Sequence, residues 1–205
     1  MKAAFFAKHG GPEELQFGEY KDPVLGAGQV MVDVHAASVN GADWRVVAGS
    51  YGPVAFFPYS PGRDFSGVVS ALGEGAKDFK IGDEVFGVCD VGTEAAYAEK
   101  VAIKEAIIAK KPAKLTHVES AAVALIGLTA LVSVEDTLQL KKGETILIQG
   151  GAGGVASFAI QIAKHIGARV ITTASAANHA YLKTLDADQI IDYRSEEHTS
   201  ELQSR

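Results

Sequence analysis

The sequence predicts a mixed fold: a β-barrel-type domain over residues 1–115, followed by part of an α/β domain with a doubly wound parallel sheet. Three observations predict it. Short apolar runs separated by glycine and proline fill the first part of the chain, which is typical of a compact antiparallel β domain. The apolar periodicity becomes helical near residue 116. Strand and helix patterns then alternate as β-α-β-α-β up to residue 193, which matches the first half of such a sheet.

Composition and charge exclude several classes of protein. The net charge of −6 gives no general attraction to nucleic acid or to anionic lipid, so neither is expected as a partner. Cys89 is the only cysteine, which excludes an intramolecular disulfide and a zinc site built on several thiolates. The apolar run between Lys2 and Lys8 is too short for a signal peptide, and the apolar stretch 121–134 is shorter than the ~18 residues of a membrane span. We therefore expect 121–134 to be a buried helix and the protein to be cytoplasmic.

The strands of the first domain are predicted from two-residue alternation. In VMVDVHA the residues Val30, Val32 and Val34 share one face, and Asp33 and His35 share the other. Further strands are expected at SGVVSAL, DEVFGV and AAYAEKVAI, with turn-rich segments between them.

The second part begins with a helix and continues with the alternating elements. Thr116 and Glu119 have the spacing of a capping box before a helix over 118–134. The strands are expected at ETILIQ, RVITTA and QIIDY, with NHAYLKTL as a helix between the last two. The helix after ETILIQ is predicted to end at Gly167. Its apolar stripe consists of Val155, Phe158, Ala159, Ile162, Ala163 and Ile166.

A glycine-rich loop lies between the first of these strands and its helix. Gly151, Ala152, Gly153, Gly154, Val155 and Ala156 satisfy the pattern G-x-G-x-x-G/A in the strand-loop-helix context that the motif requires. We assign the tight turn to Gly151, the close approach of backbone to a pyrophosphate to Gly153, and close helix packing to Ala156. The helix N-terminus would offer its free amides to the phosphates. The alternative is a turn that needs glycine only for its backbone angles, but the flanking elements favour dinucleotide binding.

The preferred dinucleotide is inferred from the end of the second strand. NAD sites usually carry an acid there, about 20 residues after the glycines. The segment TTASAANHAY (172–181) holds no acid before Asp186, which favours NADP(H). Ser175 and Asn178 are candidate hydrogen-bond donors to the coenzyme, and Tyr193 is a further coenzyme-binding candidate. No Arg or Lys stands at the strand end.

Several motifs in order resemble the medium-chain dehydrogenase/reductase family, and in particular its zinc-free, quinone oxidoreductase-like branch. They are SVNGADW (38–44), PGRDFSGVV (61–69), GDEVFGV (82–88), GLTA (127–130) and the glycine loop, and the resemblance spans about residues 1–193. It implies a GroES-like substrate domain over 1–115 and a Rossmann-type NADP-binding domain from 116 onward. It also implies hydride transfer from NADPH and a homodimeric full-length protein.

The resemblance allows the zinc site to be checked residue by residue. Zinc-dependent relatives place a cysteine ligand where Asn40 stands and a His-Glu pair where Arg63 and Asp64 stand. Asn40 and Arg63 cannot replace these ligands, so no catalytic zinc is expected. Arg63 and Asp64 are expected at most to pair structurally. The six histidines show no metal spacing, and His9, His117, His165 and His179 are expected at the surface.

Without a Lewis acid the acceptor must take hydride readily, which points to quinones and α,β-unsaturated carbonyls (enones and enals). The resemblance places Asn40 near the nicotinamide and Thr129 against its carboxamide, and we add Tyr51 as a candidate donor to a substrate carbonyl. Each has a structural alternative: Asn40 could form a turn with Gly41, Thr129 could satisfy a helix carbonyl, and Tyr51 could only pack. A second functional reading is a nicotinamide-nucleotide-binding protein without turnover, serving as a sensor or structural protein.

The sequence departs from the family pattern at two positions, and it ends in an unusual tail. NADP-preferring relatives often have a basic residue near Ala177, and Asp186 stands where a helix end usually has glycine. Residues 194–205 continue no β-α-β pattern and match the translation of a common sequencing-library adapter, the alternative being a natural polar tail. We therefore expect a sheet that is incomplete, and a 205-residue chain that is poorly soluble and inactive by itself.

Overall fold

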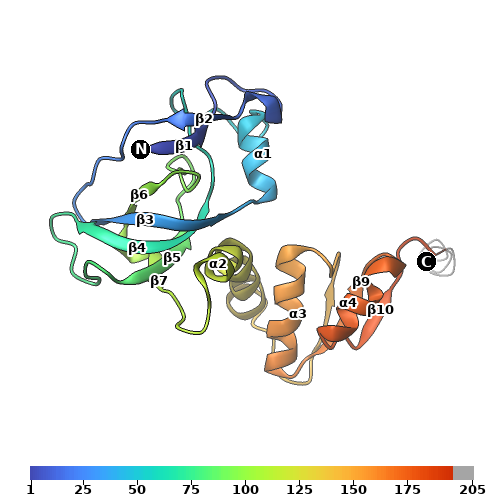
Figure 1. The fold of residues 1–205 in the computed structure, drawn as a ribbon. Coiled ribbons are helices and arrows are strands. Elements are labelled where there is room, and N and C mark those ends of the chain that lie inside the picture. Colours follow the sequence, from blue (N-terminus) through green and yellow to red (C-terminus); the bar gives the residue numbers. More distant parts are fainter. Residues whose placement is uncertain (196–205) are drawn as a thin grey trace. The chain divides into compact units, whose positions relative to one another are not determined.

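The computed structural model describes residues 1–195, in two compact units (Figure 1). The first unit is Met1–Leu125 and the second begins at Ile126, so the boundary falls inside helix α2 (His117–Leu131). The predicted tail lies outside the described residues from 196 onward.

The first unit is built from antiparallel strands, as its turn-rich sequence predicts. Five strands form one sheet in the order β6-β3-β4-β5-β7, and β1 and β2 form a separate pair. The strands of this unit are β1 (Lys2–Phe5), β2 (Gln16–Glu19), β3 (Gln29–Ser38), β4 (Asp64–Leu72), β5 (Glu84–Val88), β6 (Lys100–Lys104) and β7 (Ile108–Lys110). Single-turn 3-10 helices occupy η1 (Pro12–Glu14) and η2 (Glu105–Ile107).

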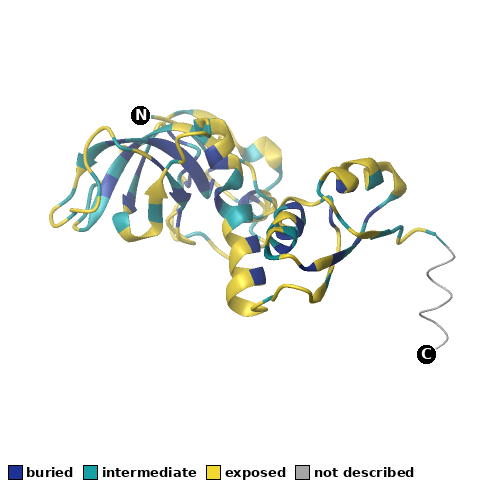
Figure 2. Cartoon of the chain, turned by 90° about the horizontal axis from the view of Figure 1, so that it is seen from below, coloured by how far each residue is buried: buried dark blue, intermediate teal, exposed yellow. Residues whose placement is uncertain are grey.

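The core of this unit confirms the alternation read from VMVDVHA. Val30 and Val32 on β3 are fully buried, whereas His35 is exposed. The two valines belong to one hydrophobic cluster with Phe65 of β4 and Val85 of β5. Figure 2 shows buried positions along the strands of this sheet. Burying a side chain of this size stabilises the fold by about 1.5–3 kcal/mol. AAYAEKVAI is only partly a strand, because β6 begins at Lys100.

Helix α1 (Gly41–Val47) was not anticipated, because it has only seven residues and starts with glycine. Its start is fixed by the Asp43 carboxylate, which accepts a hydrogen bond of 2.7 Å from the backbone N–H of Asn40. Val46 and Val47 of the helix are buried in a small cluster with Phe6. The helix therefore holds Asn40, the residue before its first turn, against the end of β3.

The second unit is the predicted β-α-β-α-β arrangement. Its three strands are parallel and lie in the order β10-β9-β8. The elements after α2 are the π-helical turn η3 (Val132–Thr137), β8 (Thr145–Ile148), α3 (Gly154–Ile166), β9 (Arg169–Thr173), the 3-10 turn η4 (Ala176–Asn178), α4 (His179–Thr184) and β10 (Gln189–Ile191). Gly167 ends α3 in the left-handed conformation, with φ of 90°, as expected.

The buried face of α3 confirms most of the predicted stripe. Ala159 and Ala163 are buried, and Phe158, Ile162 and Ile166 are partly buried against the same core. Val155 is the exception, because it is 38% exposed. Ile160 was not in the predicted stripe but is fully buried, so the buried face is wider than the sequence indicated.

Helix α2 begins at the predicted capping box. The Glu119 carboxylate accepts from the Thr116 backbone N–H at 2.8 Å, and the Thr116 hydroxyl accepts from the Glu119 N–H at 3.2 Å.

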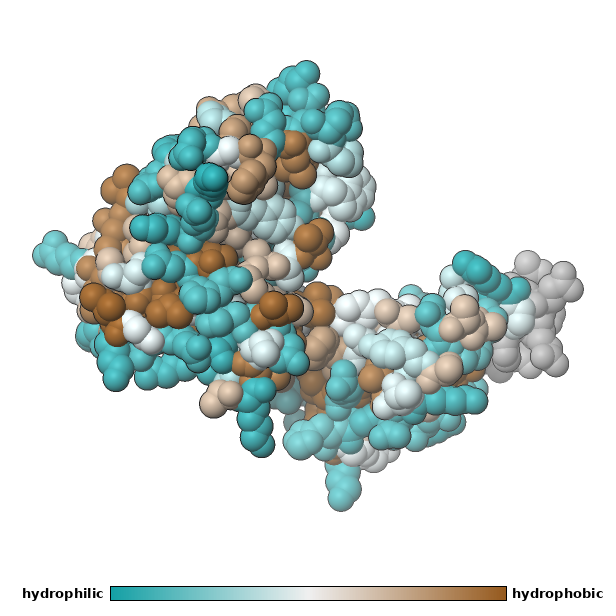
Figure 3. Space-filling view, in the orientation of Figure 1, coloured by the Kyte–Doolittle hydropathy of each residue, from teal (hydrophilic) through white to brown (hydrophobic). Residues whose placement is uncertain are grey.

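Helix α2 and η3 together form a 21-residue segment, His117–Thr137. By length and composition alone this segment could cross a membrane, but core helices of soluble proteins meet the same criteria. Only 28% of its most apolar window is buried, so the expected buried helix is only partly buried. Val118 and Leu128 of α2 are exposed apolar residues. Figure 3 shows hydrophobic surface in the region where Figure 1 places this helix.

Candidate functional site

The glycine loop connects the carboxyl end of β8 to the first turn of α3. Gly150 has φ of 66°, so it is the left-handed residue of the turn, and the prediction that assigned the tight turn to Gly151 is corrected. The loop is tied to the end of β9, because Gly150 N–H donates to the Thr173 hydroxyl at 3.0 Å and Gly151 N–H donates to the Thr173 carbonyl at 2.9 Å.

Gly151 is required for packing. A Cβ at this position would lie 2.1 Å from Thr172 Oγ1 and 3.1 Å from a methyl carbon of Leu182, and both of these residues are fully buried. Gly151 thus lets the loop lie directly against β9 and α4. The glycine that the sequence assigned to a turn is a close-approach residue, which only the tertiary structure shows.

The N-terminus of α3 is suited to an anionic group. The first i→i−4 hydrogen bond of the helix runs from Ser157 N–H to the Gly153 carbonyl (2.9 Å), so the amides of Gly154, Val155 and Ala156 precede it and have no partner within the helix. Gly153, Gly154 and Val155 are exposed, and the first turn carries no acid. Exposed amides, the positive end of the helix dipole and the absence of a carboxylate fit a diphosphate group.

The structure brings three of the predicted coenzyme-binding candidates, Ser175, Asn178 and Tyr193, to one edge of the parallel sheet. Ser175 precedes η4, and the Asn178 side-chain amide donates to its hydroxyl at 3.3 Å. Tyr193 follows β10 and is 54% exposed, with the Arg194 guanidinium 5.4 Å from its ring centroid. Parallel strands end at the same edge, which is where ligands bind in such sheets.

Asp192 is an acid at this edge that the sequence analysis did not identify. The Asp192 carboxylate accepts a hydrogen bond of 3.1 Å from the Ala176 backbone N–H, so it lies at the end of the second strand. Asp192 follows β10 and not β9, so the residues that come directly after β9 along the chain do not include it. The predicted parallel pairing of QIIDY beside RVITTA was the signal that could have found it.

In the first unit, Asn40 is held by two buried carboxylates. Its side-chain amide donates to Asp64 at 2.9 Å, and Asp64 also accepts from the Ser38 hydroxyl at 2.6 Å. Asp43 accepts from the Asn40 backbone and, at 2.7 Å, from the Tyr97 hydroxyl. Burial raises the pKa of Asp64, while the hydrogen bonds from Ser38 and Asn40 lower it. Asn40 is therefore fixed both through its backbone and through its amide.

Arg63 and Asp64 do not pair with each other as expected. The Arg63 guanidinium donates to the Cys89 carbonyl at 3.1 Å, on the strand end next to β4. Burial raises the pKa of the Cys89 thiol to about 12, so this cysteine is a neutral core residue. Among residues 1–195 no group of three or more His, Cys, Asp or Glu side chains is arranged to hold a metal ion.

The two remaining candidates occupy different units. Tyr51 is 47% exposed and lines a small cavity of about 50 Å³ together with Tyr59 and Glu94. Thr129 is exposed on α2 in the second unit, and its carbonyl accepts a hydrogen bond of 2.7 Å from the Ser133 hydroxyl. Thr129 shares its unit with the glycine loop, whereas Asn40 and Tyr51 belong to the first unit.

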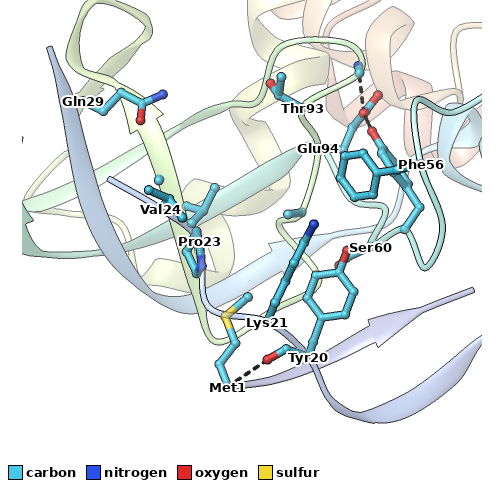
Figure 4. A pocket seen from close by; sticks show the side chains of 15 residues that line it. Met1, Tyr20, Lys21, Pro23, Val24, Gln29, Phe56, Ser60, Thr93 and Glu94 are labelled. Atoms are coloured by element: carbon cyan, nitrogen blue, oxygen red, sulfur yellow. Dashed lines mark hydrogen bonds between the residues drawn. The ribbon is translucent and has the colours of Figure 1, made fainter. Parts of the chain in front are cut away.

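A larger cavity of about 320 Å³ lies in the first unit (Figure 4). Its walls include Tyr20, Lys21, Phe56, Ser60 and Glu94, and the Lys21 ammonium lies 4.0 Å from the centroid of the Phe56 ring. None of the predicted site residues lines it. The glycine loop and the Asn40 cluster, to which the sequence assigns the chemistry, are therefore distinct from this cavity.

Two family models match the chain: "Alcohol dehydrogenase GroES-like domain" over residues 26–113 and "Zinc-binding dehydrogenase" over residues 154–205. The human quinone oxidoreductase is 34% identical over 175 residues, which is 85% of this chain and 53% of that protein. The chain belongs to the quinone oxidoreductase-like group of the medium-chain dehydrogenase/reductase family. The GroES-like and Rossmann-type architecture expected from the sequence is thereby confirmed.

Solved structures of this family agree closely with the fold. The quinone oxidoreductase from Coxiella burnetii superposes with a TM-score of 0.90 at 39% identity, covering 97% of this chain and 64% of that one. The Escherichia coli quinone oxidoreductase complexed with NADPH gives a TM-score of 0.89 at 32% identity, covering 99% of this chain and 63% of that one. The chain thus spans less than two thirds of the length of these family members.

Proposed function

We propose that the whole protein is an NADP(H)-dependent oxidoreductase that reduces quinones or α,β-unsaturated carbonyls without zinc. The observation that carries the proposal is the α3 N-terminus, where a glycine loop presents three first-turn amides at the carboxyl edge of a parallel sheet. The NADPH complex of the Escherichia coli relative supports the choice of coenzyme. We keep residues 1–115 as the substrate domain and 116–193 as the first half of the coenzyme domain.

The residues of the second unit would bind the coenzyme. The amides of Gly154, Val155 and Ala156 suit the diphosphate, and Ser175, Asn178 and the exposed Tyr193 suit the adenosine end. When bound, a reduced nicotinamide supplies a hydride to an electron-poor carbon. The remaining contribution of the protein is to orient the two reactants and to exclude water.

The residues of the first unit would contact the nicotinamide end of the coenzyme and the substrate. Asn40 is held rigidly, so its side-chain amide can orient the nicotinamide at little entropic cost. Tyr51 would donate a hydrogen bond to the substrate oxygen, and Thr129 of the second unit would contact the carboxamide. Zinc independence is supported by chemistry: the Asn40 amide and the Arg63 guanidinium donate hydrogen bonds where zinc ligation would require lone pairs.

The test uses the natural full-length protein, titrated with NADPH and NADH by calorimetry and then assayed with quinones and enals. We expect binding, and loss of absorbance at the reduced-nicotinamide band when an acceptor is added. Binding without turnover on any acceptor would favour a sensor or structural role, and no binding of either coenzyme would refute the proposal. Stoichiometric zinc required for activity would refute the zinc-free mechanism. The homodimeric state, the cytoplasmic location and the inactivity of the 205 residues alone stay predictions.

A further inference from the structure

Asp192 lies where the ends of β9 and β10 meet. The register pairs Ile191 with Thr173, and the Ala174 N–H donates to the Ile191 carbonyl at 3.0 Å, which extends the pairing by one step. The next residue, Asp192, turns its carboxylate toward the segment after β9. One oxygen accepts from the Ala176 N–H at 3.1 Å and the other accepts from the Arg194 N–H at 2.9 Å.

This position matters because coenzymes are distinguished at the end of the second strand. An acid there accepts hydrogen bonds from a free ribose 2′-hydroxyl and repels a 2′-phosphate. The chain after β9 reads TTASAANHAY and supplies no such acid. Asp192 supplies a carboxylate from the neighbouring strand, and it also occupies a backbone amide that would otherwise be available to a phosphate oxygen.

We propose that Asp192 is a specificity-determining residue, which weakens binding of coenzymes that carry a 2′-phosphate relative to those with a free 2′-hydroxyl. The inference rests on the proposed function, because it concerns the same coenzyme site. A phosphate carries a charge of about −1.5 to −2 near neutral pH, so a carboxylate beside it lowers affinity. Ser175 and Asn178, which can donate hydrogen bonds to a phosphate, act in the opposite direction. The result is a weak preference for NADPH over NADH.

The experiment measures the dissociation constants of NADPH and NADH for the full-length protein and for Asp192→Asn. We expect the variant to bind NADPH about five- to tenfold more tightly at low salt, because the carboxylate that repels the 2′-phosphate is then absent. NADH binding should be unchanged or weaker. The gain should shrink at high ionic strength, since the groups involved are partly exposed. Asp192→Ser is a second variant that keeps a short oxygen acceptor for the Ala176 amide.

The matched control is Asp186→Asn, which removes the same charge from the opposite end of β10. Asparagine tolerates the left-handed conformation of Asp186, whose φ is 59°. This control should leave the ratio of the two dissociation constants unchanged, and Asp192→Glu should retain the wild-type ratio. An equal change for both coenzymes in both neutral variants, or the same shift in Asp186→Asn, would overturn the inference. Failure of the wild-type protein to bind either coenzyme would instead refute the proposed function.

Discussion

The side-chain amide of Asn40 donates a hydrogen bond of 2.9 Å to Asp64, a residue with no exposed surface. The two positions are joined by the sheet, because β3 ends at Ser38, which pairs in register with Asp64 at the start of β4. A residue proposed to contact the nicotinamide is thus anchored by a buried acid in the neighbouring strand. Asn40 and Asp64, two positions that the resemblance aligns with zinc ligands, are thus hydrogen-bonded to each other.

Replacing Asn40 by Asp should destabilise the protein by about 1–3 kcal/mol at neutral pH, because a buried donor becomes a second carboxylate facing Asp64. One of the two acids must then hold a proton, so the loss should grow as the pH rises. Thermal unfolding between pH 5 and about 8 measures the effect. Asn40→Ala is the control, and its loss should change less with pH over that range, because it removes a hydrogen bond to Asp64 without adding a charge. A variant Asn40→Asp as stable as Asn40→Ala at every pH would contradict this account.

Gly151 and Gly153 should respond differently to alanine. Gly151→Ala places a methyl group 2.1 Å from Thr172 Oγ1, so we expect a loss of about 1–3 kcal/mol in the free energy of unfolding. Gly153 has an ordinary φ of −77°, and a Cβ there would lie 3.2 Å from the Gly150 carbonyl, a tight contact but a much milder one than at Gly151. Gly153→Ala should therefore lose less stability than Gly151→Ala, while coenzyme affinity falls. Denaturant unfolding and calorimetric titration of both variants separate the two effects. Combining Gly151→Ala with Thr172→Ala should recover part of the stability.

Asp186→Gly should stabilise the protein by up to about 1 kcal/mol, because Asp186 adopts a left-handed conformation with φ of 59°. Asp186→Ala should be destabilising, since alanine lacks the side-chain oxygen that helps Asp in this region. Thermal unfolding measures both. Equal melting temperatures for the glycine and alanine variants would show that the backbone conformation is not the cause.

His117 should make stability depend on pH. Its ring bonds the Ser66 hydroxyl at 2.8 Å, lies 3.3 Å from a Glu84 oxygen and faces the His35 ring at 4.6 Å. Burial and His35 lower the pKa of His117 from 6.5, and the Glu84 carboxylate opposes this. The unfolded chain therefore binds the proton more readily, so stability is retained above pH 6.5 and falls below it.

An NMR titration of the His117 imidazole should show a midpoint below 6.5, and unfolding between pH 6.5 and about 5 should show the loss of stability. In His117→Gln this pH dependence should be smaller. A midpoint above 6.5 would mean that Glu84 outweighs burial. The prediction that His117 is a surface residue is wrong in either case, since its side chain is only 18% exposed.

Local patterns in the sequence predicted most of the element types and their order, although not the short helix α1. Some features depend only on residues that are close in sequence, so they can be predicted from the chain itself. Examples are the alternation of Val30 and Val32, the capping box at Thr116 and the left-handed glycine that ends α3 at Gly167. The resemblance to the family was likewise carried by short motifs that lie in order.

The tertiary structure decided what depends on contacts between distant segments. Only packing against Thr172 shows why Gly151 must be glycine, and only the parallel pairing of β10 with β9 brings Asp192 to the Ala176 amide. The register between β3 and β4 joins Asn40 to Asp64, and the pairing of β4 with β5 places Arg63 beside the Cys89 carbonyl. Sequence periodicity reports which side of an element is apolar, whereas these polar contacts depend on which strand lies beside which.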